Sequence, residues 1–157
     1  VRNVVNALDD SALPARYLEL ELTESILMND VSYTLDVLNE LKEMDVELAI
    51  DDFGTGYSSL NDLKQFPIDR LKIDRSFIQN LPEDVEDQRI TQAIIAIAHS
   101  FNLSVVAEGV EEPAQAEFLT SQGCESAQGY LFGRPMPADE LSALLLSQRL
   151  GIASTPG

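Results

Sequence analysis

Short apolar runs of strand length alternate with longer stretches of helical periodicity along this chain. Residues 17–23 place apolar and polar side chains at a period of two, which is the pattern of a half-buried strand. The runs that we predict as strands are residues 17–23, 47–51, 70–74, 103–107 and 124–128. Because helical stretches separate these runs, the sequence predicts a parallel sheet and an α/β fold with about five βα units.

Local signals indicate where the predicted helices begin and end. Asp30 is a candidate N-cap for the helix that follows it, and Pro67 ends a helix because proline lacks the backbone donor. Pro113 stands where the first turn of a helix tolerates proline. No interdomain linker interrupts the pattern, so we expect one domain over residues 1–150 and a flexible tail over residues 151–157.

The charge balance excludes one class of partner and favours another. The 157 residues carry 27 acidic and 10 basic side chains, a formal net charge of −17, so charge-driven binding of DNA or RNA polymers is not expected. Most of these carboxylates are expected to form a solvated surface, but clustered carboxylates bind hard cations. Cys124 is the only cysteine and no run of about 18 apolar residues occurs. We therefore expect a reducing, cytoplasmic compartment and no membrane span in this segment.

Polar side chains stand at the carboxyl end of every predicted strand. They are Glu21 and Glu24, Asp51 and Asp52, Lys72 and Asp74, Glu108 and Glu111, and Gln128. Since the carboxyl ends of parallel strands form the functional face of βα folds, we expect these groups to converge. Carboxylates brought so close repel one another and take up protons, and divalent cations with oxygen ligands are the usual resolution.

The adjacent pair Asp51 and Asp52 is expected to point its side chains apart and to serve two metal ions that clamp a phosphodiester. Lys72 would orient a phosphate or a hydroxide nearby. Simpler interpretations stay open for each group taken alone. They are turn chemistry for Asp-Asp before Gly, an ion pair of Lys72 with Asp74, and a helix start at Thr23-Glu24-Ser25.

Five segments resemble successive motifs of the EAL domain family, in the order that the family has them. They are Glu21-Leu-Thr-Glu24, Asp51-Asp-Phe-Gly-Thr-Gly-Tyr-Ser-Ser-Leu60, Leu71-Lys-Ile-Asp74, Val106-Ala-Glu-Gly-Val-Glu111 and Ala127-Gln-Gly-Tyr-Leu131. The resemblance covers residues 1–146 and corresponds to the later two-thirds of a complete domain. It implies part of a modified (β/α)8 TIM-like barrel that hydrolyses cyclic di-GMP to linear pGpG with Mg²⁺ or Mn²⁺.

The resemblance also implies roles at the metal centre. Glu21 would bind the first metal ion, and Asp51 would bridge both ions. Asp52 would bind the second ion, and Glu108 would complete the metal and water site. Lys72 would hold the nucleophilic water.

Further residues would contact the substrate or support the site. Gln128, Glu111 and Asp74 would line the position of cyclic di-GMP. Glu24 would act beside the catalytic residues by fixing the loop over residues 52–59, which in the family couples the active site to dimerisation.

The chain departs from the family in one large respect. The family's Glu-Ala-Leu motif, a nearby substrate-binding arginine and an asparagine ligand are absent from its sequence. We therefore expect a segment of a longer domain, inactive alone, whose open sheet edges are completed by a homodimer or another chain. Three functions stay open: a phosphodiesterase in the parent protein, a non-catalytic cyclic di-GMP receptor, and a dimerisation or interaction module. The parent is expected to carry sensor or diguanylate cyclase-like domains, and in some relatives a membrane anchor.

Overall fold

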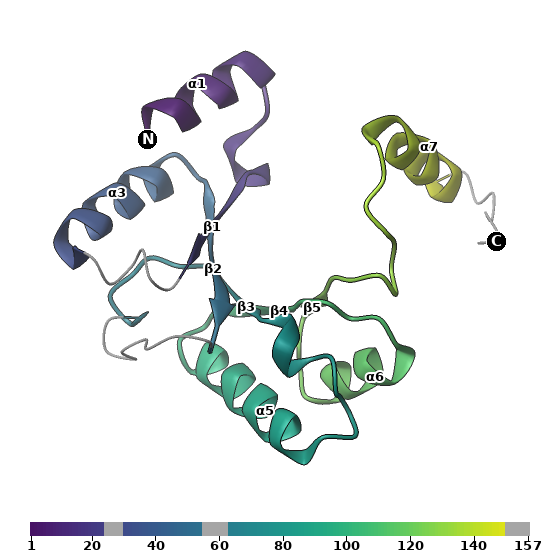
Figure 1. The fold of residues 1–157 in the computed structure, drawn as a ribbon. Coiled ribbons are helices and arrows are strands. Elements are labelled where there is room, and N and C mark those ends of the chain that lie inside the picture. Colours follow the sequence, from purple (N-terminus) through teal and green to yellow (C-terminus); the bar gives the residue numbers. More distant parts are fainter. Residues whose placement is uncertain (24–29, 55–62, 150–157) are drawn as a thin grey trace.

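The fold is that of an open α/β sheet, seen in a computed structural model that describes residues 1–23, 30–54 and 63–149 (Figure 1). Its strands are β1 (Glu19–Thr23), β2 (Glu47–Phe53), β3 (Arg70–Ile73), β4 (Ser104–Ala107) and β5 (Ser126–Ala127). Its helices are α1 (Arg2–Ser11), η1 (Ala15–Tyr17), α3 (Val31–Glu43), η2 (Arg75–Phe77), α5 (Val85–Ser100), α6 (Pro113–Ser121) and α7 (Ala138–Arg149). The predicted tail lies outside the described residues.

The five strands form one parallel sheet in the order β1-β2-β3-β4-β5. All five predicted strands are therefore confirmed; four of them are shorter than predicted, and β2 extends past residue 51 to Phe53. The strand predicted over residues 17–23 begins at Glu19, because Tyr17 closes the 3-10 turn η1. The strand predicted over residues 124–128 pairs only at Ser126 and Ala127.

One face of each central strand carries the hydrophobic core. Leu48 and Ile50 of β2, and Leu71 and Ile73 of β3, are fully buried. Successive side chains in a strand point to opposite faces, so these residues share the side on which α3 and α5 pack. The alternate residues of the same strands are therefore turned to the other face of the sheet.

The α-helices α3, α5 and α6 each begin at a residue that favours a helix start. Two of these residues, Asp30 and Pro113, are predicted from the sequence. The Asp30 side chain accepts a hydrogen bond from Tyr33 N at 3.1 Å, which confirms the predicted N-cap of α3. Pro113 occupies the first turn of α6, also as predicted. Asp84 caps α5 by accepting hydrogen bonds from two successive amides.

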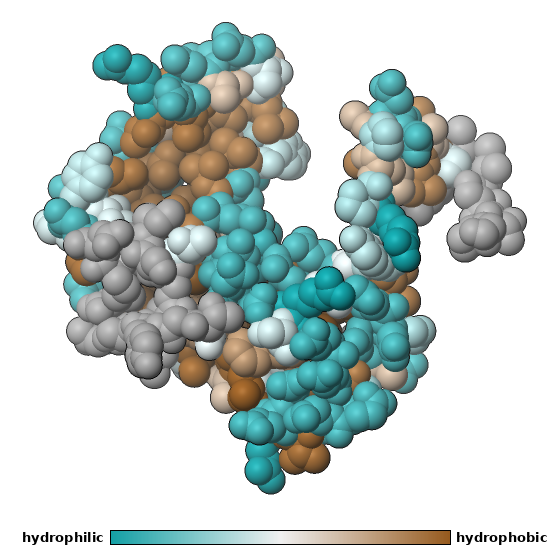
Figure 2. All heavy atoms as spheres, in the orientation of Figure 1, coloured by the Kyte–Doolittle hydropathy of each residue, from teal (hydrophilic) through white to brown (hydrophobic). Residues whose placement is uncertain are grey.

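The second face of the sheet carries charged side chains at both ends of the strands, with the buried apolar residues Ala49 and Val106 between them. Near the amino ends of the strands, Arg70 of β3 forms ion pairs with Glu19 of β1 and, at 3.2 Å, with Glu47 of β2. Hydrophilic residues gather over the hollowed region between the α1 end of the molecule and α7 (Figure 2). α7 stands apart from the sheet at the end of a long connection (Figure 1). Among the described helices, none has both the length and the apolar character needed to cross a bilayer.

Candidate functional site

A β-bulge in β2 brings neighbouring carboxylates to one place. Ile50 pairs with Leu71 and Phe53 pairs with Ile73, so β2 uses one residue more than β3 over this interval. The extra residue is accommodated by Asp52, whose φ is +54°. Oxygen atoms of Asp51, Asp52 and Glu108 consequently lie within 4.8 Å of one another. The expectation that Asp51 and Asp52 point apart is therefore wrong, because it assumed a regular strand.

Lys72 lies among three carboxylates from three other strands or strand ends. Its Nζ is 2.5 Å from Glu21, 2.6 Å from Glu108 and 2.9 Å from Asp51. The residue is 3% exposed. Burial lowers the pKa of Lys72, but its contacts with Glu108, Glu21 and Asp51 outweigh this effect and hold the pKa above its usual value. Lys72 is therefore a permanent cation, able to donate hydrogen bonds and unable to accept a proton at neutral pH.

The carboxylates around Lys72 fit a divalent cation. Asp51 Oδ1 is buried and, among the described residues, meets no donor at hydrogen-bond geometry, although the Lys72 ammonium lies 2.9 Å away. One lysine also leaves the negative charge of Glu21, Asp51, Asp52 and Glu108 only partly balanced. An all-oxygen set of this kind suits Mg²⁺ or Mn²⁺.

Asp52 faces other acids. Burial, then Asp51, then Asp74 raise the pKa of the Asp52 carboxyl, and Lys72 opposes them. Such mutual repulsion is what a bound cation relieves.

Glu21 and Asp74 lie near the acidic cluster but make contacts that the sequence did not predict. Glu21 contacts Lys72 but is not one of the three carboxylates that converge. Asp74 accepts a hydrogen bond from Ser76 N at 3.1 Å and so starts η2. Lys72 pairs with carboxylates of other strands and not with Asp74, so the simpler ion-pair interpretation is wrong.

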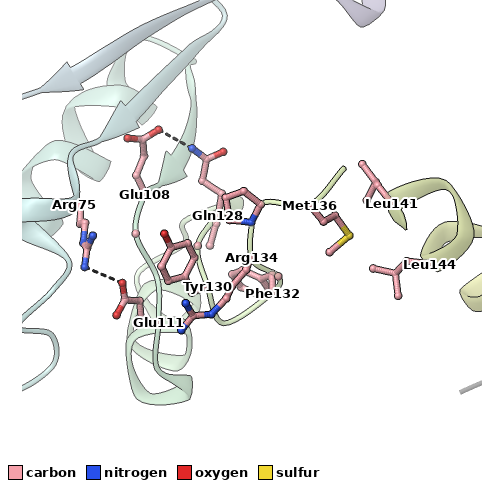
Figure 3. A pocket seen from close by; sticks show the side chains of 15 residues that line it. Arg75, Glu108, Glu111, Gln128, Tyr130, Phe132, Arg134, Met136, Leu141 and Leu144 are labelled. Atoms are coloured by element: carbon pink, nitrogen blue, oxygen red, sulfur yellow. Dashed lines mark hydrogen bonds and ion pairs between the residues drawn. The ribbon is translucent and has the colours of Figure 1, made fainter. Parts of the chain in front are cut away.

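The carboxyl end of β5 reaches the same site. Gln128 Nε2 donates a hydrogen bond of 2.7 Å to Glu108 Oε1, the oxygen that also contacts Lys72. Beside this pair, Glu111 forms a 2.8 Å ion pair with Arg75 (Figure 3). The structure therefore brings Gln128 into the acidic cluster and places Glu111 on its rim.

A cavity of about 710 Å³ opens next to Glu108 and Gln128 and extends to α7. Its lining includes Tyr130 and Arg134, whose guanidinium lies 4.8 Å from the centre of the Tyr130 ring (Figure 3). Sequence reasoning missed Arg75, Tyr130 and Arg134 as lining residues. Arg75 follows the end of β3 closely and Tyr130 lies within the last of the five motifs, whereas Arg134 carries no such signal.

Glu24 and residues 55–59 of the supporting loop lie outside the described residues. The proposed role of Glu24 stays a prediction.

Comparison with protein families identifies the arrangement. The sequence model of the EAL domain matches residues 1–135. The chain belongs to the EAL domain family. Its open parallel sheet is part of the barrel of that family, as expected from the resemblance.

Two relatives that are named for an activity are similar to this chain in sequence. Over 153 residues the chain is 50% identical to cyclic di-GMP phosphodiesterase NbdA of Pseudomonas aeruginosa, covering 98% of this chain and 20% of NbdA. Over 143 residues it is 52% identical to the bifunctional diguanylate cyclase/cyclic di-GMP phosphodiesterase MucR of the same organism, covering 91% of this chain and 21% of MucR. The chain thus spans about one fifth of the length of these curated relatives.

Solved EAL structures superpose well on the fold. The MucR phosphodiesterase in complex with c-di-GMP has a TM-score of 0.85 at 52% identity, covering 89% of this chain and 57% of that chain. A manganese/cy-diGMP complex of Klebsiella pneumoniae BlrP1 has a TM-score of 0.77 at 32% identity, covering 84% of this chain and 34% of that chain.

Proposed function

We propose that this chain forms part of a metal-dependent phosphodiesterase that hydrolyses cyclic di-GMP to linear pGpG. The observation that carries the proposal is the convergence of Asp51, Asp52 and Glu108 around a buried, charged Lys72. NbdA and MucR, which bear this activity in their names, support the same substrate.

Mg²⁺ or Mn²⁺ would be held by Asp51, Asp52 and Glu108, with Glu21 beside them. A divalent ion there supplies Lewis-acid polarisation of a phosphodiester oxygen. The manganese/cy-diGMP complex of BlrP1 supports a divalent metal together with this nucleotide. Lys72 donates N–H groups into the cluster, so it orients the attacking water or steadies charge on the phosphate, and does not act as the base.

The remaining site residues would contact the nucleotide. Gln128 is held by Glu108, which leaves its carbonyl oxygen able to accept a hydrogen bond. Glu111 and Asp74 lie on neighbouring loops, where a carboxylate can accept hydrogen bonds from a guanine or a ribose.

Activity of the whole protein needs more than the 157 residues. Because the Glu-Ala-Leu glutamate is absent from the sequence, we expect this chain alone to be inactive. We propose that further chain, or a homodimer partner, covers the open edges of β1 and β5. Sensor or cyclase-like domains in the same polypeptide and a cytoplasmic site for this part belong to the same proposal.

The test is turnover by the complete gene product. Purified protein is incubated with cyclic di-GMP and Mn²⁺, and pGpG is quantified by chromatography. We expect Mn²⁺-dependent hydrolysis that falls at least about 100-fold in Asp51→Asn, since removing a metal-ligating charge costs on this scale. Glu83→Gln is the matched control and should keep full activity, because Glu83 is an exposed carboxylate outside the residues assigned to the site.

Other outcomes discriminate between the candidate functions. Tight binding of cyclic di-GMP without turnover would make the protein a receptor. Neither binding nor turnover would leave an interaction module and would overturn the proposal.

A further inference from the structure

The loop after β4 carries Glu108 and Glu111, and its backbone is held mostly by main-chain groups. Glu108 N donates to Ile73 O at 3.1 Å, which ties the loop to β3. Val110 N donates to Gln128 O at 3.0 Å, which ties it to β5. No substitution of a side chain can remove these two bonds directly.

A single buried side chain completes the attachment. Gln115 of α6 is 3% exposed. Its Oε1 accepts hydrogen bonds from Glu111 N at 2.8 Å and from Glu112 N at 3.0 Å. Its Nε2 donates to Gln79 O at 3.4 Å, a longer contact with the segment that follows η2.

The same loop is packed against η2 by a close approach of backbone and side chain. A Cβ at Gly109 would stand 2.3 Å from Arg75 Cγ, so the aliphatic part of Arg75 lies directly on the loop. The Arg75 guanidinium then reaches Glu111 at 2.8 Å (Figure 3). The loop between Glu108 and Glu111 is therefore held by contacts with β3, β5, η2 and Gln115.

The geometry points to Gln115 as a positioning residue for the loop 108–112, and through it for the carboxylates Glu108 and Glu111. The effect of Gln115 on metal binding rests on the proposed function, because Glu108 belongs to the metal site proposed there. Gln115 touches neither metal nor substrate; it acts by fixing two consecutive amides next to them. The competing interpretation is a helix cap only, since Gln115 lies in the first turn of α6.

The two interpretations predict different extents of backbone loosening when the Gln115 side chain is replaced. Loss of a helix cap loosens the first turn of its own helix and frees the amides of Glu111 and Glu112, whereas loss of a positioning residue also loosens residues 106–110. Gln115→Leu keeps the bulk and leaves two amides without an acceptor. Gln115→Glu keeps an acceptor for both amides at the favourable N-terminus of a helix. Gln115→Asn is shorter and milder, and serves if the leucine variant does not fold.

Hydrogen exchange of the complete gene product, read by mass spectrometry of peptides, decides the matter. In Gln115→Leu we expect exchange over residues 106–110 to rise about tenfold, the effect of one to two lost hydrogen bonds. Gln115→Glu should stay within about threefold of wild type. Asp84→Ala is the matched control, because Asp84 also accepts from two successive amides, Glu86 N at 2.8 Å and Asp87 N at 3.0 Å, at the start of α5. It should loosen its own helix and leave residues 106–112 unchanged.

The Mn²⁺ affinity measured by calorimetry gives a second readout. Gln115→Leu should weaken Mn²⁺ binding about tenfold, as for other residues that hold a metal ligand in place. Exchange that rises only over residues 111–118, which include the two amides that lose their acceptor in either case, would overturn the inference and leave a helix cap. If the wild type binds no Mn²⁺, the proposed function fails, while exchange over residues 106–110 still decides the role of Gln115.

Discussion

Replacing Lys72 with methionine removes the ammonium from the acidic cluster while keeping a side chain of similar length. The ammonium contacts Glu21, Glu108 and Asp51 at 2.5 to 2.9 Å. Each contact is an attraction of several kcal/mol, roughly 6 kcal/mol at an effective dielectric constant near 20, and the cost of taking the charges out of water offsets most of it. Removing one partner of a buried ion pair typically costs about 3–5 kcal/mol.

The lower end of that range applies here. The Glu21 side chain is 46% exposed, so water screens it once the lysine is gone. Lys72→Met should therefore lower the free energy of unfolding by about 3 kcal/mol, which is a shift of about 1.5 M in the urea midpoint at an m-value near 2 kcal/mol/M. Lys64→Met, which replaces an exposed lysine, is the control and should change the midpoint little.

The same variant tests whether the cluster binds metal. Without the ammonium, Mn²⁺ no longer competes with Lys72 for Asp51 and Glu108, so added Mn²⁺ should stabilise Lys72→Met more than wild type. The pKa of Lys72 is raised above its usual 10.5, so its contribution to stability is complete below that pH and is lost only as the pH rises beyond it. The difference between the two proteins should therefore be constant from about pH 7 to 9. A destabilisation below about 0.5 kcal/mol, or one that Mn²⁺ does not reduce, would refute this account of the cluster.

Two further substitutions probe the scaffold around the site. A Cβ at Gly129 would stand 2.1 Å from Val110 O, which is backbone, so Gly129→Ala should cost at least about 2 kcal/mol in urea unfolding, whereas Gly133→Ala, with nothing within 4 Å, should be close to neutral. Glu125→Ala removes the acceptor of a 2.8 Å hydrogen bond from Val105 N and should cost about 1 kcal/mol at pH 7. Burial raises the pKa of Glu125, but the Val105 amide helps to lower it below its usual 4.5, so the stability from this group is present above that pH and lost as the pH falls through the lowered value. Thermal melts from pH 7 to pH 3 should show the wild type and Glu125→Ala converging in acid, and a gap that persists there would contradict the assignment.

Local sequence patterns predicted the order of the helices and strands better than they predicted which side chains contact one another at the site. The period-two runs and the helix caps depend on neighbours in sequence, which is why all five strands and the Asp30 cap could be predicted. The convergence of Asp51 with Asp52 could not, because it depends on a bulge that appears only when β2 is paired with β3. The strand-end pattern predicted that Lys72 converges with these carboxylates, but it left the Asp74 ion pair open, because only the paired sheet shows which carboxylates reach the ammonium.

The charged layer at the amino ends of the strands limits how this chain can be recombined with other EAL domains. Arg70 is shared between Glu19 of β1 and Glu47 of β2, so three strands contribute to one set of ion pairs. A chimera that exchanges β1 alone with a relative lacking a carboxylate at position 19 removes one of the two acids that compensate Arg70. Crossover points for grafting or shuffling therefore belong before β1 or after β3, and segments 19–73 should travel between relatives as a single block.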